Sequence, residues 1–175
     1  VNPANDAKLM ASTLRAQGFE VIERLDVDQV AMRLAVTEFG KKLELAEREL
    51  DGSGAAGRAI GLFYYAGHGL QVDGENYLVP IKAPIENESH VRIYTVSASE
   101  ILGVIGYAGN ALNIVILDAC RNNPLSRSFR TAVRGLAPMS APTGTFVAYS
   151  TAPGQVALDG AGSNSPYTEA LGRAI

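Results

Sequence analysis

The sequence predicts an α/β fold of three layers, helix–sheet–helix, in which the sheet is mostly parallel. Two short runs, residues 59–65 and 112–120, are rich in apolar, β-branched or aromatic residues, and the second loses its apolar character at Asp118. Such runs are typical of strands buried on both faces, as in a parallel sheet covered by helices. Segments with helical periodicity alternate with strands along the chain, which is the order of an α/β fold.

The first helix is expected to begin at Asn2 and Pro3, because asparagine caps helices and proline suits the first helical position. Its apolar face repeats at helical spacing and consists of Ala7, Met10, Ala11 and Leu14. Gly18 is expected to end this helix, and residues 19–23 predict a strand after it.

Asp26 and Gln29 predict a second helix, since their types and spacing resemble a capping box. Its buried stripe is expected to consist of Val27, Val30, Ala31, Leu34 and Ala35. After Gly40 the pattern allows either a kink or a helix that continues through residues 41–50. The charges of that stretch favour a solvated face over a partner-binding helix, and residues 51–57 predict a flexible loop.

The strand at residues 59–65 is followed by a predicted hairpin, residues 71–79, that turns at Asp73 and Gly74. Residues 80–92 are expected to form polar connecting chain, and Ser97 with Glu100 predicts the capped start of another helix. The apolar face of that helix consists of Ile101, Val104, Ile105 and Ala108.

The strand at residues 112–120 comes next, and residues 121–144 are expected to be irregular. Residues 145–149 predict a further strand, and Ser165 with Pro166 predicts the start of a last helix. The residues that this helix is expected to turn inward are Tyr167, Ala170, Leu171 and Ala174.

Length and composition indicate one globular domain. The chain has 175 residues, 47% of them hydrophobic and 19% charged, and a net charge of −3, which argues against general nucleic-acid binding. Its single cysteine excludes an internal disulfide framework and fits a reducing compartment, so the cytoplasm is favoured over others without being established. No apolar run is long enough to span a membrane. The chain begins at Val1 without a signal peptide, so we expect a fragment of a longer chain.

His68 and Cys120 are the candidate catalytic residues, because each lies just past the apolar part of one of the two strands. Ligands of open α/β sheets bind outside the carboxyl ends of the strands, so neighbouring strands would bring these residues together. A cysteine and a histidine that meet in this way form a thiol nucleophile with its base. The alternatives are a buried structural cysteine and a turn histidine satisfied by backbone.

Two motifs carry a resemblance to a known family. Residues 64–69, Tyr-Tyr-Ala-Gly-His-Gly, and residues 117–124, Leu-Asp-Ala-Cys-Arg-Asn-Asn-Pro, resemble the histidine and cysteine motifs of bacterial caspase-like peptidases, relatives of metacaspases and caspases. Residues 2–7 and 149–155 extend the resemblance over nearly the whole chain. It implies that residues 1–175 form one caspase-like peptidase domain with the caspase–haemoglobinase fold. It also implies a first strand at the centre of the sheet, before the first helix, which this sequence does not contain.

The resemblance implies a cysteine endopeptidase that works through a Cys–His dyad and an acyl-enzyme. His68 would protonate the leaving amine, and the backbone N–H groups of Gly69 and Cys120 would form the oxyanion hole. The rival hypothesis is a catalytically silent caspase-like signalling or scaffold domain, whose members usually lose the histidine or the cysteine. A flavodoxin-like binding domain is a more distant alternative, since no glycine-rich loop opens a helix here in the required way.

Asp118 is the candidate specificity residue, because side chains two apart on an extended strand point the same way and Cys120 lies two residues on. By resemblance to metacaspases, an acid here binds arginine or lysine on the amino side of the cut bond. The alternative is that Asp118 accepts backbone N–H bonds from the following turn. The resemblance also assigns substrate-backbone binding to Ser150, Thr151 and Ala152, with plain loop as the alternative.

The basic segment after Cys120 is where many family members cut themselves, so Arg127, Arg130 and Arg134 are candidate self-cleavage sites. A solvated basic loop is the equal alternative. Asp159 would add a second negative charge to the specificity pocket only if the fold brings it there, and His90 is assigned no role. We expect peptide or protein substrates, no membrane partner, no metal site and no cofactor. Calcium activation and oligomeric state stay open.

Overall fold

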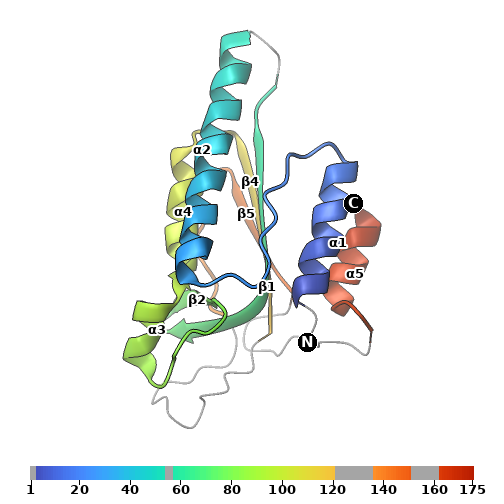
Figure 1. Cartoon of the computed structure of the whole chain (residues 1–175). Coiled ribbons are helices and arrows are strands. Elements are labelled where there is room, and N and C mark those ends of the chain that lie inside the picture. Colours follow the sequence, from blue (N-terminus) through green and yellow to red (C-terminus); the bar gives the residue numbers. More distant parts are fainter. Residues whose placement is uncertain (1–2, 54–56, 121–135, 151–161) are drawn as a thin grey trace.

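A computed structural model describes residues 3–53, 57–120, 136–150 and 162–175 (Figure 1). Its strands form one five-stranded sheet in the order β3-β2-β1-β4-β5. The strands are β1 (Ile60–Val72), β2 (Glu75–Val79), β3 (Val96–Ser97), β4 (Leu112–Cys120) and β5 (Thr145–Tyr149). β4 runs parallel to both β1 and β5, whereas β2 is antiparallel to β1 and to β3. The predicted α/β class is therefore confirmed, with a sheet that is mixed at the β2–β3 end.

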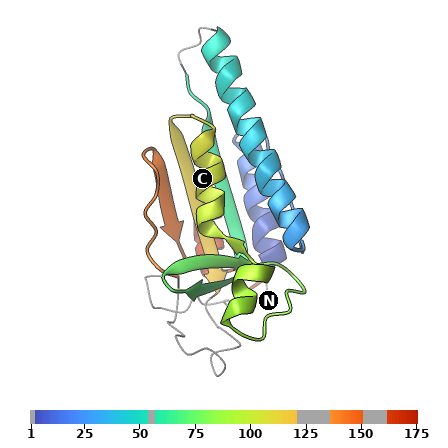
Figure 2. The same cartoon turned by 90° about the vertical axis from the view of Figure 1, so that its left-hand side faces the viewer.

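Helices cover both faces of the sheet. α2 (Gln29–Ser53) and α4 (Ala98–Tyr107) lie side by side on one face, and α1 (Pro3–Ala16) and α5 (Pro166–Ala174) lie together on the other (Figures 1 and 2). A short helix, α3 (Glu88–Tyr94), lies beside the β2 end of the sheet. These are the three layers that the sequence predicts.

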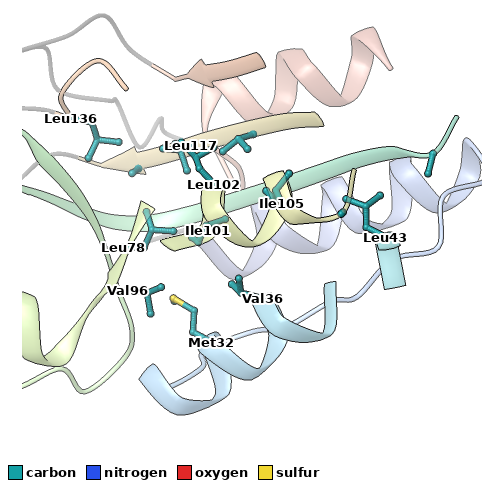
Figure 3. Close-up of a cluster of buried hydrophobic side chains, with 14 residues drawn as sticks. Met32, Val36, Leu43, Leu78, Val96, Ile101, Leu102, Ile105, Leu117 and Leu136 are labelled. Atoms are coloured by element: carbon teal, nitrogen blue, oxygen red, sulfur yellow. The ribbon is translucent and has the colours of Figure 1, made fainter. Parts of the chain in front are cut away.

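The main hydrophobic core lies between the sheet and the α2–α4 layer (Figure 3). Most of its members come from α2, α4, β2, β3 and β4, and Leu136 joins them from the segment before β5. They include Met32, Val36, Leu43, Leu78, Val96, Ile101, Leu102, Ile105, Leu117 and Leu136. α2 and α4 approach so closely that a Cβ on Gly40 would collide with the side chain of Val104. Gly40 is thus a packing residue of an unbroken helix and not a kink.

The burial of α2 differs from the expected stripe. Val30 and Leu34 are 67% and 64% exposed, and the buried positions are Met32, Val36, Gly40, Leu43 and Glu47. Two overlapping apolar patterns exist in this helix, and the one that contains Gly40 permits close packing on α4. The start of the helix was also placed too early, because Asp28 rather than Asp26 caps it, accepting a hydrogen bond from the Ala31 N–H at 2.9 Å.

The predicted strand at residues 19–23 is wrong, since this segment has no regular structure. Over residues 60–67, β4 pairs with one edge of β1. Among the described residues, no strand pairs with the opposite edge over this range. A cavity of about 430 Å³ lies beside this open edge, lined mainly by apolar residues of α1, α2, β1 and the segment 19–27. A strand is stable only beside a partner, so residues 19–23 cannot form one alone.

Helix termini mostly follow the expected capping signals. Gly18 has φ +85° after α1, and the Ser97 hydroxyl accepts the N–H groups of Ser99 and Glu100 at the start of α4. Ser165 caps α5 by accepting the Thr168 N–H at 3.0 Å. The inward residues of α5 were misjudged, because Ala170 and Ala174 are exposed and the fully buried position is Thr168. α3 was missed within the predicted connecting chain.

Candidate active site

His68 and Cys120 are directly paired in the sheet, as the last pair of the parallel β1–β4 ladder. The prediction that two neighbouring parallel strands bring them to one edge is therefore confirmed at the level of the backbone. Their positions differ in detail, because His68 lies inside β1 and Cys120 is the last residue of β4, whereas both were expected just beyond a strand. The His68 side chain is exposed, so a substrate can reach it.

β1 runs past His68 because it changes partner there. His68 pairs with Cys120 of β4 and with Val79 of β2, and after this residue β1 pairs only with β2. The hairpin turns at Asp73 and Gly74, as predicted, with φ angles of 51° and 80°. Two successive positive φ angles are typical of the tight turns that match strand twist. The histidine therefore lies where three strands meet.

The Tyr65 hydroxyl supports this junction from within the core. It donates hydrogen bonds to the carbonyl oxygens of His68, at 2.9 Å, and Val79, at 3.1 Å. Burial raises the pKa of Tyr65 well above its usual value, so this donor keeps its proton. A Cβ on Gly67 would lie 2.5 Å from the Tyr65 hydroxyl oxygen, so only glycine lets the tyrosine pass beneath the strand.

The Asp118 carboxylate is buried and reaches α5. Its Oδ2 atom accepts hydrogen bonds from the hydroxyls of Ser165 and of Thr168, the latter at 2.7 Å. The Thr168 hydroxyl also lies 2.5 Å from that of Tyr64. Burial, together with the nearby charge of Asp118, raises the pKa of Tyr64 far above its usual value. Asp118 thus fastens the first turn of α5 to the sheet, two residues before Cys120.

Asp6 is a second buried carboxylate at this place, and the sequence reasoning missed it. Its Oδ1 atom accepts hydrogen bonds from the Asn164 side chain and the Ser165 N–H, each at 2.9 Å. Burial chiefly, and the Asp118 charge in addition, raise the pKa of Asp6 above 3.8. A signal existed, because Asp6 precedes Met10 by four residues and so falls on the apolar face of the first helix.

The two carboxylates share an unbalanced arrangement. In the described part of the chain, no lysine or arginine forms an ion pair with Asp6 or Asp118. Each has one oxygen bonded by two donors and a second oxygen without a hydrogen-bond partner among the described residues. Burial of a carboxylate is unfavourable unless its charge is compensated, so two neighbouring buried carboxylates are an unusual feature of this face.

Some predicted site residues cannot be placed. Arg127, Arg130, Arg134, Thr151, Ala152 and Asp159 lie outside the described residues. Ser150 is described, and its N–H donates to the Leu117 carbonyl at 3.1 Å, which extends the β4–β5 pairing by one bond. Among the described residues no three histidine, cysteine, aspartate or glutamate side chains cluster as a metal site would require. The helices in the same ranges include none that is long and apolar enough to cross a membrane.

Comparison with known proteins gives one family and two relatives. The caspase domain family of peptidases matches residues 1–175. The chain is 32% identical to human mucosa-associated lymphoid tissue lymphoma translocation protein 1 over 119 residues, which are 68% of this chain and 13% of that protein. The mouse homologue is 31% identical over 119 residues, 68% of this chain and 12% of the homologue. The chain thus corresponds to a small part of each relative.

Proposed function

The chain belongs to the caspase domain family, and from this premise we propose that it is a cysteine endopeptidase that cuts after arginine or lysine. The observation that carries the proposal is the pairing of His68 with Cys120 at the end of the parallel β1–β4 ladder. Neither half of the expected dyad is missing, which favours an enzyme over a silent scaffold domain.

In the proposed reaction the Cys120 thiolate attacks the peptide carbonyl, and the bond to the leaving amine breaks as His68 protonates that amine. Water then hydrolyses the acyl-enzyme and releases the thiolate. A positioned acid–base group of this kind contributes about 10²–10⁴ in rate. The backbone N–H groups of Gly69 and Cys120 would stabilise the oxyanion, and one such donor is worth about 10²–10³ in rate.

The preference for basic residues rests on Asp118 and its buried neighbour Asp6. The hydroxyls of Ser165 and Thr168 bind one oxygen of Asp118, and in the proposal the other oxygen accepts from a substrate side chain. A carboxylate about 4 Å from a guanidinium gains about 4 kcal/mol at an effective dielectric constant of about 20, before desolvation. A fraction of this gives about 10- to 100-fold preference over a neutral side chain. The competing interpretation is that Asp118 only anchors α5.

The test is a set of fluorogenic peptides that differ only in the residue before the cut bond, assayed with wild type, Cys120→Ala and His68→Ala. We expect turnover after arginine and lysine by wild type, and none by either variant. The double variant should be no worse than the single ones, because such groups act as a unit. His90→Ala is the matched control, since it removes the chain's only other histidine.

A peptidyl electrophile followed by mass spectrometry should place the adduct on Cys120. Turnover that survives Cys120→Ala, with native circular dichroism, would refute the dyad. An inactive wild type that the electrophile does not label would favour the scaffold alternative. The proposed reaction uses no cofactor, and parallel assays with calcium and with a chelator decide whether calcium activates it.

A further inference from the structure

Asn76 of β2 makes a two-sided contact with a distant piece of backbone. Its side chain is 1% exposed, its Nδ2 donates to the Ala137 carbonyl at 2.8 Å, and its Oδ1 accepts the Ala137 N–H at 2.7 Å. The Tyr149 hydroxyl donates to the same carbonyl at 3.3 Å. The Asn76 amide thus bonds both backbone groups of Ala137, as the backbone of a neighbouring strand would. Ala137 is held by Asn76 of β2 on one side and by Tyr149 of β5 on the other.

Leu136, the residue before this clamp, packs beneath the catalytic edge. It is 3% exposed, and it belongs to the main core together with Leu78, Leu117 and Ala119 (Figure 3). A Cβ on Gly69 would lie 2.9 Å from the Leu136 Cδ2 atom and 3.1 Å from the Ala119 Cβ atom. Leu136 therefore packs closely against the backbone of Gly69, which follows His68, and lies near Ala119, which precedes Cys120.

We infer that Asn76 and Leu136 are positioning residues for the oxyanion hole, and this inference rests on the proposed function. The hydrogen bonds between Asn76 and Ala137 hold the Leu136 side chain against Gly69. The leucine in turn prevents the Gly69 backbone from moving toward the core. Neither residue touches the substrate. Their action is to keep the Gly69 N–H at a fixed distance from the Cys120 N–H, so that both can face the oxyanion.

Loss of this support should appear in the chemical step rather than in substrate binding. A displacement of about 1 Å at a reacting centre can lower the rate about 100-fold, and loss of one oxyanion donor has an effect of about 10²–10³. For Asn76→Ala and Leu136→Ala we expect kcat to fall about 10- to 100-fold, with KM for the best peptide of the panel nearly unchanged.

Two reagents separate this role from a general loss of structure. Iodoacetamide alkylates the Cys120 thiolate as the carbon–iodine bond breaks and iodide leaves, so no oxyanion forms. A peptide aldehyde instead forms a tetrahedral hemithioacetal whose oxygen lies where the oxyanion would lie. Both variants should bind the aldehyde about tenfold or more weakly and should be alkylated by iodoacetamide at the wild-type rate.

Matched variants control for stability alone. Leu102→Ala removes another buried leucine of the same core, and Asn113→Ala removes another buried asparagine, at the opposite end of β4. Both should lower the melting temperature as the test variants do, yet keep the wild-type kcat. Leu136→Met, which nearly conserves the volume, should restore most of the kcat lost in Leu136→Ala.

Wild-type kcat in folded Asn76→Ala and Leu136→Ala would overturn the inference, and so would an equal fall of kcat and alkylation rate. If Asn76→Ala does not fold, the milder Leu136→Val decides on the same criteria. Failure of the proposed function looks different, because wild type itself would then neither cleave the peptides nor bind the aldehyde.

Discussion

The two faces of the sheet differ in chemistry, although one strand, β4, contributes side chains to both. β4 turns Leu117 toward α2 and α4, where it joins an apolar core, and turns Asp118 toward α1 and α5, where it meets hydroxyl groups. On this second face lies a polar network whose members are Asp6, Tyr64, Asp118, Asn164, Ser165 and Thr168.

Under the proposed function, the difference separates stability from recognition. Apolar burial on the α2–α4 face stabilises the fold by about 25 cal/mol per Å². Buried carboxylates on the α1–α5 face oppose folding unless they are fully paired, and under the proposed function they serve substrate recognition. The Leu117 face of β4 would then hold His68 and Cys120 in place, and the Asp118 face would determine which substrate side chain binds.

Adjacent residues of β4 test this separation with the largest expected effects. Leu117→Ala should lower the free energy of unfolding by about 2–5 kcal/mol and leave the preference for arginine intact. Asp118→Asn should lower the preference for arginine over a neutral residue about 10- to 100-fold. Its effect on unfolding should be smaller, because the amide oxygen still accepts the hydroxyl hydrogen bonds. Denaturant unfolding and the peptide panel measure the two quantities.

If Asp118→Asn kept its full preference for arginine, Asp118 would only anchor α5 and would not select the substrate. If folded Leu117→Ala changed that preference as strongly as Asp118→Asn, the two faces would not have separate roles.

Substitution of two glycines, Gly40 and Gly172, tests how tightly the helices are packed on the two faces. A Cβ on Gly40 would collide with Val104 of α4, whereas a Cβ on Gly172 would lie 3.5 Å from Leu9, an ordinary contact. Gly40→Ala should therefore lower the free energy of unfolding by about 1–3 kcal/mol. Gly172→Ala should raise it by up to about 1 kcal/mol, because alanine is the better helix former. Equal losses in thermal or denaturant unfolding would show that both helix pairs are packed alike.

Asp6 gives the smallest and most specific effect, a change in pH dependence. Its pKa in the folded protein lies above 3.8, so its contribution to stability is greatest below pH 3.8 and is lost as pH rises through the folded-state pKa. Asp6→Asn removes this titration while its amide oxygen can still accept the hydrogen bonds of Asn164 and Ser165. We expect the variant to lose less stability than wild type as pH rises above 3.8. Unfolding curves across this range measure the effect, and parallel curves for both proteins would contradict it.

Much of the candidate catalytic edge, where His68 lies beside Cys120, was predictable because it depends on local patterns. Apolar runs located β1 and β4, and their alternation with helices implied parallel pairing, which brings His68 beside Cys120. Capping chemistry located the starts of α4 and α5, since Ser97 and Ser165 act on the next few residues.

Features that depend on distant packing were not predictable in the same way. The buried stripe of α2 is selected by Gly40 against Val104, a contact between two helices that no local pattern indicates. Asp6 and Asp118 meet only because α1 and α5 share one face, and the residue of α5 that is buried there is a threonine rather than an apolar residue. The segment 19–23 has strand-like composition, but a strand also requires a neighbour.

Because α1 packs against α5, this side of the sheet can be completed only after α5 has been synthesised. The Asn5 side chain donates to the Ser163 carbonyl across 158 positions, so the two helices come from opposite ends of the chain. The elements from α2 to β4, residues 29–120, are contiguous, and they supply most of the apolar core. Since chains fold from the N-terminus as the ribosome makes them, this core can begin to assemble before α5 exists. We expect a nascent chain to contain the paired His68 and Cys120 strands before Ser165 and Thr168 fix Asp118. Under the proposed function, the chain would then acquire its substrate preference last.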